Sequence, residues 1–267
     1  MNVSEKKSRR IYFFTRIGGK HRVAPKLLEY MPPLEEMDTY VEPFAGAAQL
    51  FLFMPLLPPK TKIVLNDIDR DIYHMWKDVR VVDEKEMRSM PWEGDRQLFH
   101  SLKNHVPEKT DPPHLRLFRN LYLSYYSFSG DKSGGFASKP SIRGKHFLDT
   151  LPLLKKKLEK AVILNQDYIK VLQRYDSPHT FFYLDPPYLG KDHLYGGRGI
   201  DPVELYHACL QLKGNFLLSY NRDKAVEKLF GKHFYLYTLP VPYISTKSKN
   251  KVEELLISNV RCAAHRA

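Results

Sequence analysis

The sequence predicts an α/β fold in which helices cover both faces of a mostly parallel sheet. Short β-rich runs alternate with helical patterns along most of the chain, and such alternation is typical of parallel βαβ units. The alternation is interrupted between residues 81 and 145, where a helical region precedes a Gly- and Ser-rich segment. We therefore expect residues 1–80 and 146–267 to form the α/β domain and residues 81–145 to form an inserted, mainly helical lobe.

The expected strands are short apolar runs bounded by turn residues or helical patterns. They are Thr39–Glu42, Lys62–Leu65, Val162–Leu164, Thr180–Leu184, Asn215–Ser219, Tyr235–Leu239 and Leu255–Ser258. The expected helices carry apolar side chains at a spacing of three to four residues. They are Ala24–Tyr30, Ala47–Phe53, Asp69–Val79, His114–Phe128, Leu151–Lys160, Pro202–Gln211 and Lys224–Phe230.

Charge favours a polyanionic partner. The 267 residues include 42 Lys and Arg against 30 Asp and Glu, a formal net charge of +12, while a hydrophobic content of 43% is enough for a sizeable core. Nucleic acid fits this excess best, because each phosphate neutralised by a basic side chain releases condensed counterions. The alternatives are a merely basic surface and an anionic membrane, which would call for an amphipathic basic helix or a lipidation signal.

The two cysteines and the short apolar runs predict a cytoplasmic protein without a metal or membrane partner. Cys209 and Cys262 lie far apart and lack metal-ligand spacing, so we expect no disulfide framework, zinc site or redox pair. The apolar run Leu50–Leu57 contains Pro55 and is too short to span a bilayer. Ile11–Phe14 is too short for the core of a signal peptide.

The strongest motif is Asp185-Pro186-Pro187-Tyr188, which directly follows an apolar strand. Ligands of open α/β sheets bind beyond the carboxyl ends of the strands, and two prolines leave carbonyls without competing donors. The Asp185 carboxylate and the Pro186 carbonyl would accept the hydrogens of an aryl amine and direct its lone pair towards a methyl group. Tyr188 would stack on an extruded base. The alternative is an ordinary strand-ending turn.

A second motif, Glu42-Pro43-Phe44-Ala45-Gly46-Ala47, joins a strand to an apolar helix through small residues that permit close approach of a ligand. Because it has one glycine where a dinucleotide fingerprint has three, an adenosine ligand without phosphates fits better. The alternative is that small residues at such a joint only allow the strand and the helix to pack closely. At the tip of the next strand, Asp67 can accept ribose hydroxyls, whereas Asp69 fits the N-cap of the following helix.

A fourth segment, residues 15–20, reads Thr-Arg-Ile-Gly-Gly-Lys. Gly18 and Gly19 permit a tight turn, and Lys20 can pair with a ligand carboxylate. The segment lacks the spacing of a phosphate loop and the hydroxyl after its lysine, which disfavours a nucleotide-hydrolysing enzyme. By itself it is a common loop.

Taken together and in this order, the four segments resemble the Dam-type adenine-N6-specific DNA methyltransferases, over about Ile11–Asn259. Two further segments are similar to that family: Asn165-Gln166-Asp167-Tyr168, where the family has an Asp-aromatic pair near the cofactor adenine, and the ending Lys251–Leu256. The family usually has Tyr or Trp at the position of Arg16. Its recognition hairpin usually contains an Arg-x-Asn that this chain lacks, so the target sequence is not transferable from relatives.

The resemblance implies a Rossmann-like methyltransferase sheet with an antiparallel last strand, S-adenosylmethionine as methyl donor, and a target-recognition lobe. It implies transfer to the N6 amino group of adenine in a specific duplex DNA sequence after base flipping. The residues implied to bind the cofactor are Arg16, Gly18, Gly19, Lys20, Glu42, Pro43, Phe44, Gly46, Ala47, Asp67, Ile68, Asp167, Tyr168 and Asp185. The residues implied in catalysis are Asp185, Pro186, Pro187 and Tyr188.

Basic residues beside the expected lobe predict contacts with DNA phosphates. Residues 130–160 contain eight Lys or Arg against three Asp or Glu, and phosphate contacts position a protein on DNA. The expected DNA-binding residues are Tyr126, Ser129, Lys132, Lys139, Arg143, Lys145 and Arg198. The run Lys155–Lys157 is more typical of a solvated helix face. Leu121, Tyr125 and Phe128, at helical spacing, are expected in the core.

Several other functions fit the same residues. An N4 amino group of cytosine presents a similar amine to the same turn, and RNA or a protein amide are further acceptors. A catalytically silent DNA-binding relative is a candidate of another class, although the complete Asp185–Tyr188 motif disfavours it. Duplex DNA is the expected partner of a monomer, and a separately acting cognate restriction endonuclease is a further candidate partner.

Overall fold

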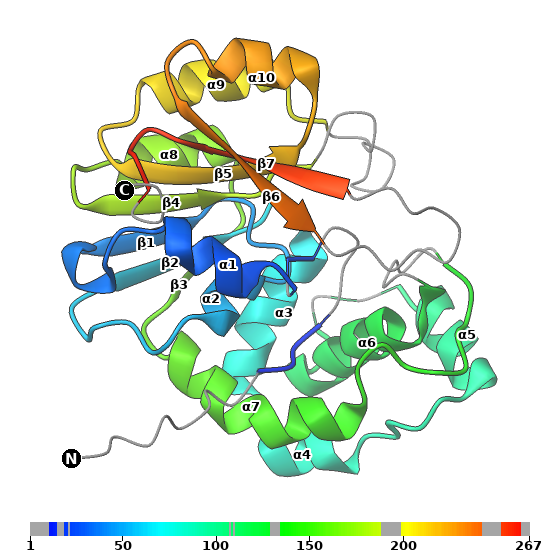
Figure 1. Cartoon of the computed structure of the whole chain (residues 1–267). Coiled ribbons are helices and arrows are strands. Elements are labelled where there is room, and N and C mark those ends of the chain that lie inside the picture. Colours follow the sequence, from blue (N-terminus) through cyan, green and yellow to red (C-terminus); the bar gives the residue numbers. More distant parts are fainter. Residues whose placement is uncertain are drawn as a thin grey trace, which may run out of the picture. The chain divides into compact units, whose positions relative to one another are not determined.

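The computed structural model describes residues 11–14, 19–20, 22–106, 108, 110–128, 134–187, 199–241 and 252–262. The chain divides into two compact units (Figure 1). The helical unit comprises Met1–Gly19, Phe51–Leu56 and His74–Glu159, and the sheet unit comprises Lys20–Leu50, Leu57–Tyr73 and Lys160–Ala267. The expected lobe, residues 81–145, lies within the helical unit.

The sheet unit contains a seven-stranded sheet in the order β3-β2-β1-β4-β5-β7-β6. Its strands are β1 Thr39–Glu42, β2 Lys62–Asn66, β3 Val162–Leu164, β4 Thr180–Leu184, β5 Asn215–Asn221, β6 Tyr235–Val241 and β7 Val252–Ser258. From β3 to β5 every neighbouring pair is parallel, whereas β7 is antiparallel to both β5 and β6. The predicted fold, a mostly parallel sheet with an antiparallel last strand, is confirmed.

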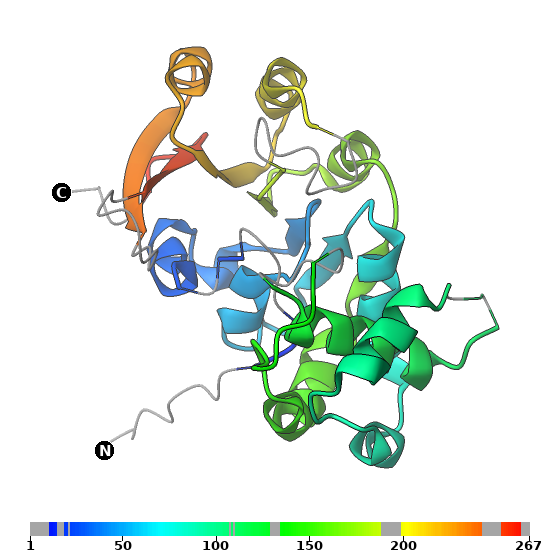
Figure 2. The ribbon, with the colours of Figure 1, turned by 90° about the vertical axis from the view of Figure 1, so that its right-hand side faces the viewer.

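Helices lie on both faces of the sheet. On one face, strand residues such as Val41, Phe182 and Leu218 pack against three helices, which Figures 1 and 2 show along one side of the sheet. These helices are α8 Tyr168–Tyr175, α9 Pro202–Leu210 and α10 Lys224–Phe230. On the other face, α1 (Ala24–Leu27) continues into a 3-10 turn, η1 (Leu28–Tyr30). The ring of Tyr30 lies 5.4 Å from that of Tyr237 in β6. A second 3-10 turn, η2, spans Leu34–Glu36.

The helical unit is built around α6, whose residues from Leu117 to Tyr126 are almost all buried. Its helices are α4 Glu84–Ser89, α5 Arg96–Asn104, α6 Pro113–Tyr126 and α7 Gly144–Leu158, and α2 (Gln49–Phe53) and α3 (Arg70–Val81) each belong in part to this unit. The side chains of Asp83 and Asp95 accept hydrogen bonds from backbone N–H groups of the first turns of α4 and α5, as N-cap residues do.

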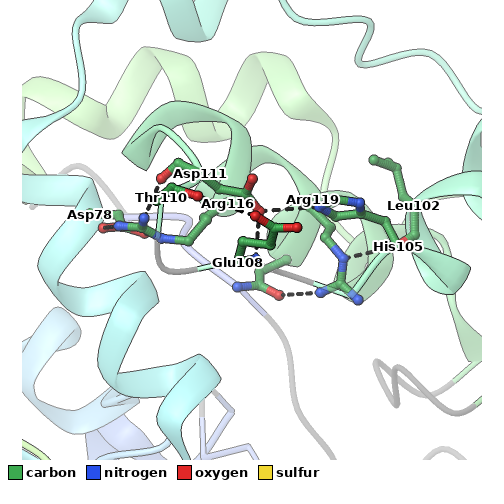
Figure 3. A network of polar contacts seen from close by, with 9 residues as sticks. Asp78, Leu102, His105, Glu108, Thr110, Asp111, Arg116 and Arg119 are labelled. Carbon is green, nitrogen blue, oxygen red and sulfur yellow. Dashed lines mark hydrogen bonds and ion pairs between the residues drawn. The ribbon is translucent and has the colours of Figure 1, made fainter.

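A polar network joins three helices of this unit (Figure 3). Arg116 of α6 donates from Nη2 to Oδ1 of Asp78 in α3 at 2.7 Å and from Nε to Oδ2 at 3.1 Å. Arg119, one turn further along α6, donates to the carbonyl of Leu102 in α5 at 2.8 Å. The Asp78 side chain is only 5% exposed, so its bidentate pair with Arg116 replaces the water that a carboxylate otherwise requires.

Helix α7 begins at Gly144, before the predicted start at Leu151, and it contains Pro152. Proline is favoured in the first turn of a helix, and this preference accounts for the wrong boundary. Within a helix, Pro152 has no N–H for the carbonyl four residues earlier, that of Leu148. Arg88 of α4 donates from Nη2 to this carbonyl at 3.3 Å, which compensates for the missing bond.

Within the described ranges, no helix has the combination of length and apolar character that a bilayer span requires. Within the same ranges, no three or more His, Cys, Asp or Glu side chains gather where they could hold a metal ion.

Candidate active site

The sheet brings four of the motifs to one edge. Glu42 ends β1, Asp67 follows β2, Asn165 follows β3 and Asp185 follows β4. These strands are parallel neighbours, so their carboxyl ends meet at the same edge, where ligands of open α/β sheets bind. We call this the carboxyl edge.

Asp185 is held at the carboxyl edge by two side chains. The ammonium of Lys20 lies 2.8 Å from Oδ1 of Asp185, and the hydroxyl of Ser219 in β5 donates to the same oxygen at 3.0 Å. The hydroxyl of Tyr183 in β4 lies 3.1 Å from that of Ser219. Asp185 keeps 23% of its side chain exposed, whereas Lys20 keeps 6%, so the carboxylate is oriented from within and reachable from outside.

Lys20 has a second carboxylate partner, which was not among the predicted site residues. Its ammonium lies 2.8 Å from Oε1 of Glu254 in β7, whose side chain is 8% exposed. A buried carboxylate requires a partner, but β7 also contains Glu253, so the strand sequence alone does not tell which of the two carboxylates is buried. Any ligand carboxylate would share the Lys20 ammonium with Asp185 and Glu254.

Burial and neighbouring charges together determine the pKa values of Lys20, Asp185 and Tyr183. Burial lowers the pKa of Lys20, but the carboxylates of Asp185 and Glu254 outweigh burial and raise the pKa well above its ordinary value, so the ammonium stays charged. Burial raises the pKa of Asp185, Lys20 opposes that rise, and the negative charge of Glu254 adds to it. Burial also raises the pKa of Tyr183, which therefore stays a neutral hydroxyl.

The loop after β1 is fastened to the end of β2. The backbone N–H of Gly46 donates to Oδ2 of Asp67 at 2.8 Å, and that of Asp69 donates to Oδ1 at 2.9 Å. Gly46 has a φ of +47°, which favours glycine, and a Cβ placed there would have no other atom within 4 Å. The loop therefore presents an open backbone surface. Asp69 also accepts from the N–H of Asp71 at 2.9 Å, which confirms its expected N-cap role.

Asn66, the last residue of β2, joins the neighbouring loops. Its Nδ2 donates to the carbonyl of Pro43 at 2.8 Å and to that of Gln166 at 2.9 Å. Asn165 donates in turn to the carbonyl of Asp67 at 2.8 Å. These amide contacts, buried or partly buried, fix the loops after β1, β2 and β3 relative to one another, a role that the local sequence pattern does not reveal.

Further predicted cofactor residues follow the ends of β1, β2 and β3. The ring of Phe44, half-buried, lies 5.0 Å from that of Tyr168, whose hydroxyl donates to Glu204 at 3.2 Å. Ile68 is 47% exposed. Asp167 is exposed and caps α8 by accepting from the N–H of Ile169 at 2.9 Å.

Glu42 is 1% exposed and accepts a 2.6 Å hydrogen bond from the hydroxyl of Tyr40. Burial raises the pKa of Tyr40, and the neighbouring Glu42 charge adds to that rise. Pro43, Ala47 and Pro186 are buried, whereas Gly19 is exposed and Pro187 is half-buried. Six predicted site residues lie outside the described residues: Arg16, Gly18, Ser129, Lys132, Tyr188 and Arg198.

Of the predicted DNA contacts in the helical unit, Lys139, Arg143 and Lys145 are exposed. Tyr126 is 4% exposed, and its hydroxyl donates to the carbonyl of Trp92 at 2.7 Å. The expectation that Phe128 belongs to the core is wrong, because α6 ends at Tyr126 and Phe128, beyond it, is 64% exposed.

The lysine run at the end of α7 is largely engaged within the helical unit. Lys157 is buried and donates to the carbonyls of Phe51, at 2.8 Å, and Met54, at the end of α2. Lys155 donates to the carbonyl of Val82 at 2.9 Å. These two side chains are thus bonded to backbone carbonyls of their own unit.

A parallel sheet with an antiparallel last strand, a small-residue loop after β1 and an Asp-Pro-Pro turn after β4 define the methyltransferase class of α/β enzymes. Residues 17–240 match the family described as D12 class N6 adenine-specific DNA methyltransferase. The chain belongs to this family and is a site-specific, adenine-specific DNA methyltransferase.

A curated relative and two solved structures are similar to the chain. It is 25% identical over 201 residues to the Type II methyltransferase M.MjaIII of Methanocaldococcus jannaschii, covering 66% of this chain and 68% of that protein. The putative methyltransferase yhhF from Escherichia coli aligns over 89% of this chain and 85% of its own, with 13% identity and a TM-score of 0.37. Protein LPL1258 from Legionella pneumophila aligns over 90% and 81%, with 12% identity and a TM-score of 0.30.

Proposed function

We propose that this enzyme transfers the methyl group of S-adenosylmethionine to the N6 amino group of an adenine flipped out of a specific duplex DNA sequence. The observation that carries the proposal is the position of Asp185. Its carboxylate lies at the carboxyl edge, is held by Lys20 and Ser219, and remains 23% exposed. It directly precedes the Pro186-Pro187 turn and follows the strand next to β1, whose loop fits a nucleoside.

The residues of the carboxyl edge fit this cofactor. Asp67 stands at the tip of β2, where a carboxylate can accept the hydroxyls of a ribose. The half-buried ring of Phe44 and the exposed side chain of Ile68 offer apolar contacts to an adenine. The open backbone at Gly46 permits close approach of the ligand. We assign to cofactor binding Arg16, Gly18, Gly19, Lys20, Glu42, Pro43, Phe44, Gly46, Ala47, Asp67, Ile68, Asp167, Tyr168 and Asp185.

When bound, S-adenosylmethionine supplies an electrophilic methyl group on a positively charged sulfur. The Asp185 carboxylate and the Pro186 carbonyl accept the two N–H groups of the adenine amine, which directs its lone pair towards the methyl carbon. An N–C bond would form as the donor's C–S bond breaks, and Asp185 would accept the proton that the methylated amine loses and pass it to solvent. Alignment and electrostatic complementarity account for catalysis without a strong base.

The amine of a paired adenine cannot reach this carboxylate, so the base must leave the stack. The motif assigns Tyr188 to the face of the flipped base. Exposed Lys139, Arg143 and Lys145 of the helical unit, together with Ser129, Lys132 and Arg198, would hold the DNA backbone. Tyr126 is omitted from this set because its ring is buried. We propose that the enzyme acts as a cytoplasmic monomer, separately from any cognate restriction endonuclease.

Sequencing of DNA treated with the purified protein and S-adenosylmethionine, with modification-sensitive detection, tests the proposal. We expect N6-methyladenine at one short recurring sequence. Methylation of cytosine at N4, or of adenine without sequence preference, would contradict the proposed target. DNA incubated without S-adenosylmethionine is the control for modifications already present.

A further inference from the structure

The side chain of Tyr168 links the loop after β1 to helix α9. Tyr168 is the first residue of α8 and is 5% exposed, and its ring lies 5.0 Å from that of Phe44, with 37° between the ring planes. At its other end, the Tyr168 hydroxyl donates a 3.2 Å hydrogen bond to Oε2 of Glu204 in α9. Glu204 belongs to none of the motifs at the carboxyl edge. Through one tyrosine ring it is nevertheless connected to the phenylalanine proposed to face the cofactor adenine.

The hydrogen bond to Glu204 determines how the Tyr168 ring is held. A buried tyrosine hydroxyl requires a hydrogen-bond partner, and a bond to a charged acceptor is stronger than one to a neutral group. Burial raises the pKa of Tyr168, and the negative charge of Glu204 adds to that rise. The hydroxyl therefore keeps the proton that it donates, and the ring is held at its hydroxyl end.

The Tyr168 ring in turn supports Phe44. Tyr168 belongs to the apolar core that α8, α9 and α10 form with the sheet, and Phe44 packs against that core while remaining half-buried. One part of the Phe44 ring is therefore covered and another part is open to a ligand. Because side chains in a core are closely packed, a change in the orientation of Tyr168 would also move Phe44.

Glu204 also has an ordinary structural explanation. It lies in the first turn of α9, where a negative charge interacts favourably with the helix dipole. That explanation depends on the charge of Glu204, whereas the bond to Tyr168 depends on an acceptor oxygen. Substitutions that remove the charge and the acceptor separately can therefore distinguish the two roles.

We propose that Glu204 is a positioning residue for S-adenosylmethionine and acts by holding the Tyr168 ring against Phe44. Glu204 fixes the hydroxyl of Tyr168, and the Tyr168 ring fixes that of Phe44, which packs against the adenine. The inference extends the cofactor site to α9, a helix that contains none of the predicted cofactor residues. It rests on the proposed function, since it takes Phe44 as a wall of the adenosine site.

Dissociation constants for S-adenosylmethionine and S-adenosylhomocysteine test the inference, because both ligands carry the same adenosine. Glu204→Ala removes the acceptor, and Tyr168→Phe removes the donor but keeps the ring. Each substitution should raise both Kd values by about threefold to tenfold, a part of what a hydrogen bond to a charged group contributes. Glu204→Gln keeps an acceptor oxygen without the charge, and its Kd values should stay within about twofold of the wild type.

Glu227→Ala is the matched control, because Glu227 lies in the first turn of α10 and pairs with exposed Arg222. Its Kd values should match those of the wild type. In the double variant Glu204→Ala/Tyr168→Phe both partners of one hydrogen bond are absent, so its Kd values should exceed those of the weaker-binding single variant by less than about twofold. Glu204 is exposed, so the comparison of Glu204→Ala with Glu204→Gln carries the test if Tyr168→Phe does not fold.

Three results would overturn the inference. They are unchanged Kd values in Glu204→Ala, equal losses of affinity in Glu204→Ala and Glu204→Gln, and a double variant in which the two single losses multiply.

These measurements concern binding and need no methyl transfer. A wild type that shows the expected pattern of Kd values but does not methylate adenine would refute the proposed reaction and support the role of Glu204. A wild type that methylates adenine, with Kd values insensitive to Glu204→Ala, would refute only the role of Glu204.

Discussion

The backbone N–H of Gly46 donates a 2.8 Å hydrogen bond to Oδ2 of Asp67, which fastens the loop after β1 to the tip of β2. The other carboxylate oxygen accepts from Asp69. The residue proposed to bind the ribose therefore also shapes the loop proposed to face the adenosine. Cofactor affinity and loop geometry depend on the same carboxylate.

Asp67→Ala should weaken S-adenosylmethionine binding by about 10- to 100-fold, because it removes a charged acceptor and two loop contacts. Isothermal titration of the purified variant measures this loss. Asp69→Ala is the control: it removes an N-cap worth about 1 kcal/mol and should leave cofactor affinity within about threefold. Equal losses of affinity in the two variants would show that Asp67 acts only through general stability.

The rate of methyl transfer should rise with pH across an acidic limb and then stay level. Transfer requires the ionised form of Asp185, whose pKa burial raises, so the limb should lie above the ordinary Asp value of about 3.9. Lys20 has a raised pKa, so its ammonium persists as pH rises, and no alkaline loss is expected below about pH 10. Single-turnover rates across this range provide the test, and a decline between about pH 8 and 9 would contradict it.

Arg116→Met should destabilise the protein by about 3–5 kcal/mol, because it leaves the buried carboxylate of Asp78 without its bidentate partner. Denaturant unfolding measures the change. Arg222→Met is the matched control, since Arg222 pairs with Glu227 and Glu253 at an exposed position, where ion pairs contribute little. A loss in Arg116→Met no larger than in Arg222→Met would mean that the network in Figure 3 does not stabilise the fold.

Reversing the charges of Lys139, Arg143 and Lys145 to Glu should reduce the salt dependence of DNA binding. Each phosphate contact contributes about 0.9 to the slope of log K against log salt, so loss of three contacts lowers it by about 2.7. Binding isotherms at several salt concentrations measure the slope. Reversal of exposed Lys60, Lys213 and Lys232, which precede the starts of β2, β5 and β6, changes the net charge equally at the opposite edge of the sheet. An equal loss of slope in both triple variants would indicate a general charge effect.

Local pattern was sufficient to predict the fold and most of the carboxyl edge. β1 and β4 have the predicted bounds, because apolar runs that end in a carboxylate or a turn leave little freedom. The same runs placed Asp67 and Asp185 at the carboxyl edge of the sheet, since the ends of parallel strands converge.

Local patterns do not show which residues that are distant in the sequence contact one another. The predicted last strand began at Leu255, one residue after Glu254. The prediction therefore gave neither the face of the sheet on which Glu254 lies nor its contact with Lys20. Ser219 was expected in a strand, but a single hydroxyl in an apolar run carries no signal for its bond to Asp185. Phe128 was placed in the core because helical spacing was extended two residues past the end of α6 at Tyr126.

Methyl transfer by wild type and Asp185→Ala, with isotopically labelled S-adenosylmethionine and identification of the labelled nucleoside, tests the central claim most directly. We expect labelled N6-methyladenine from the wild type and, at saturating S-adenosylmethionine, a loss of at least about 100-fold in the variant, with unfolding still cooperative. Substantial N6-methyladenine from Asp185→Ala would contradict the assignment of Asp185 as the acceptor of the target amine.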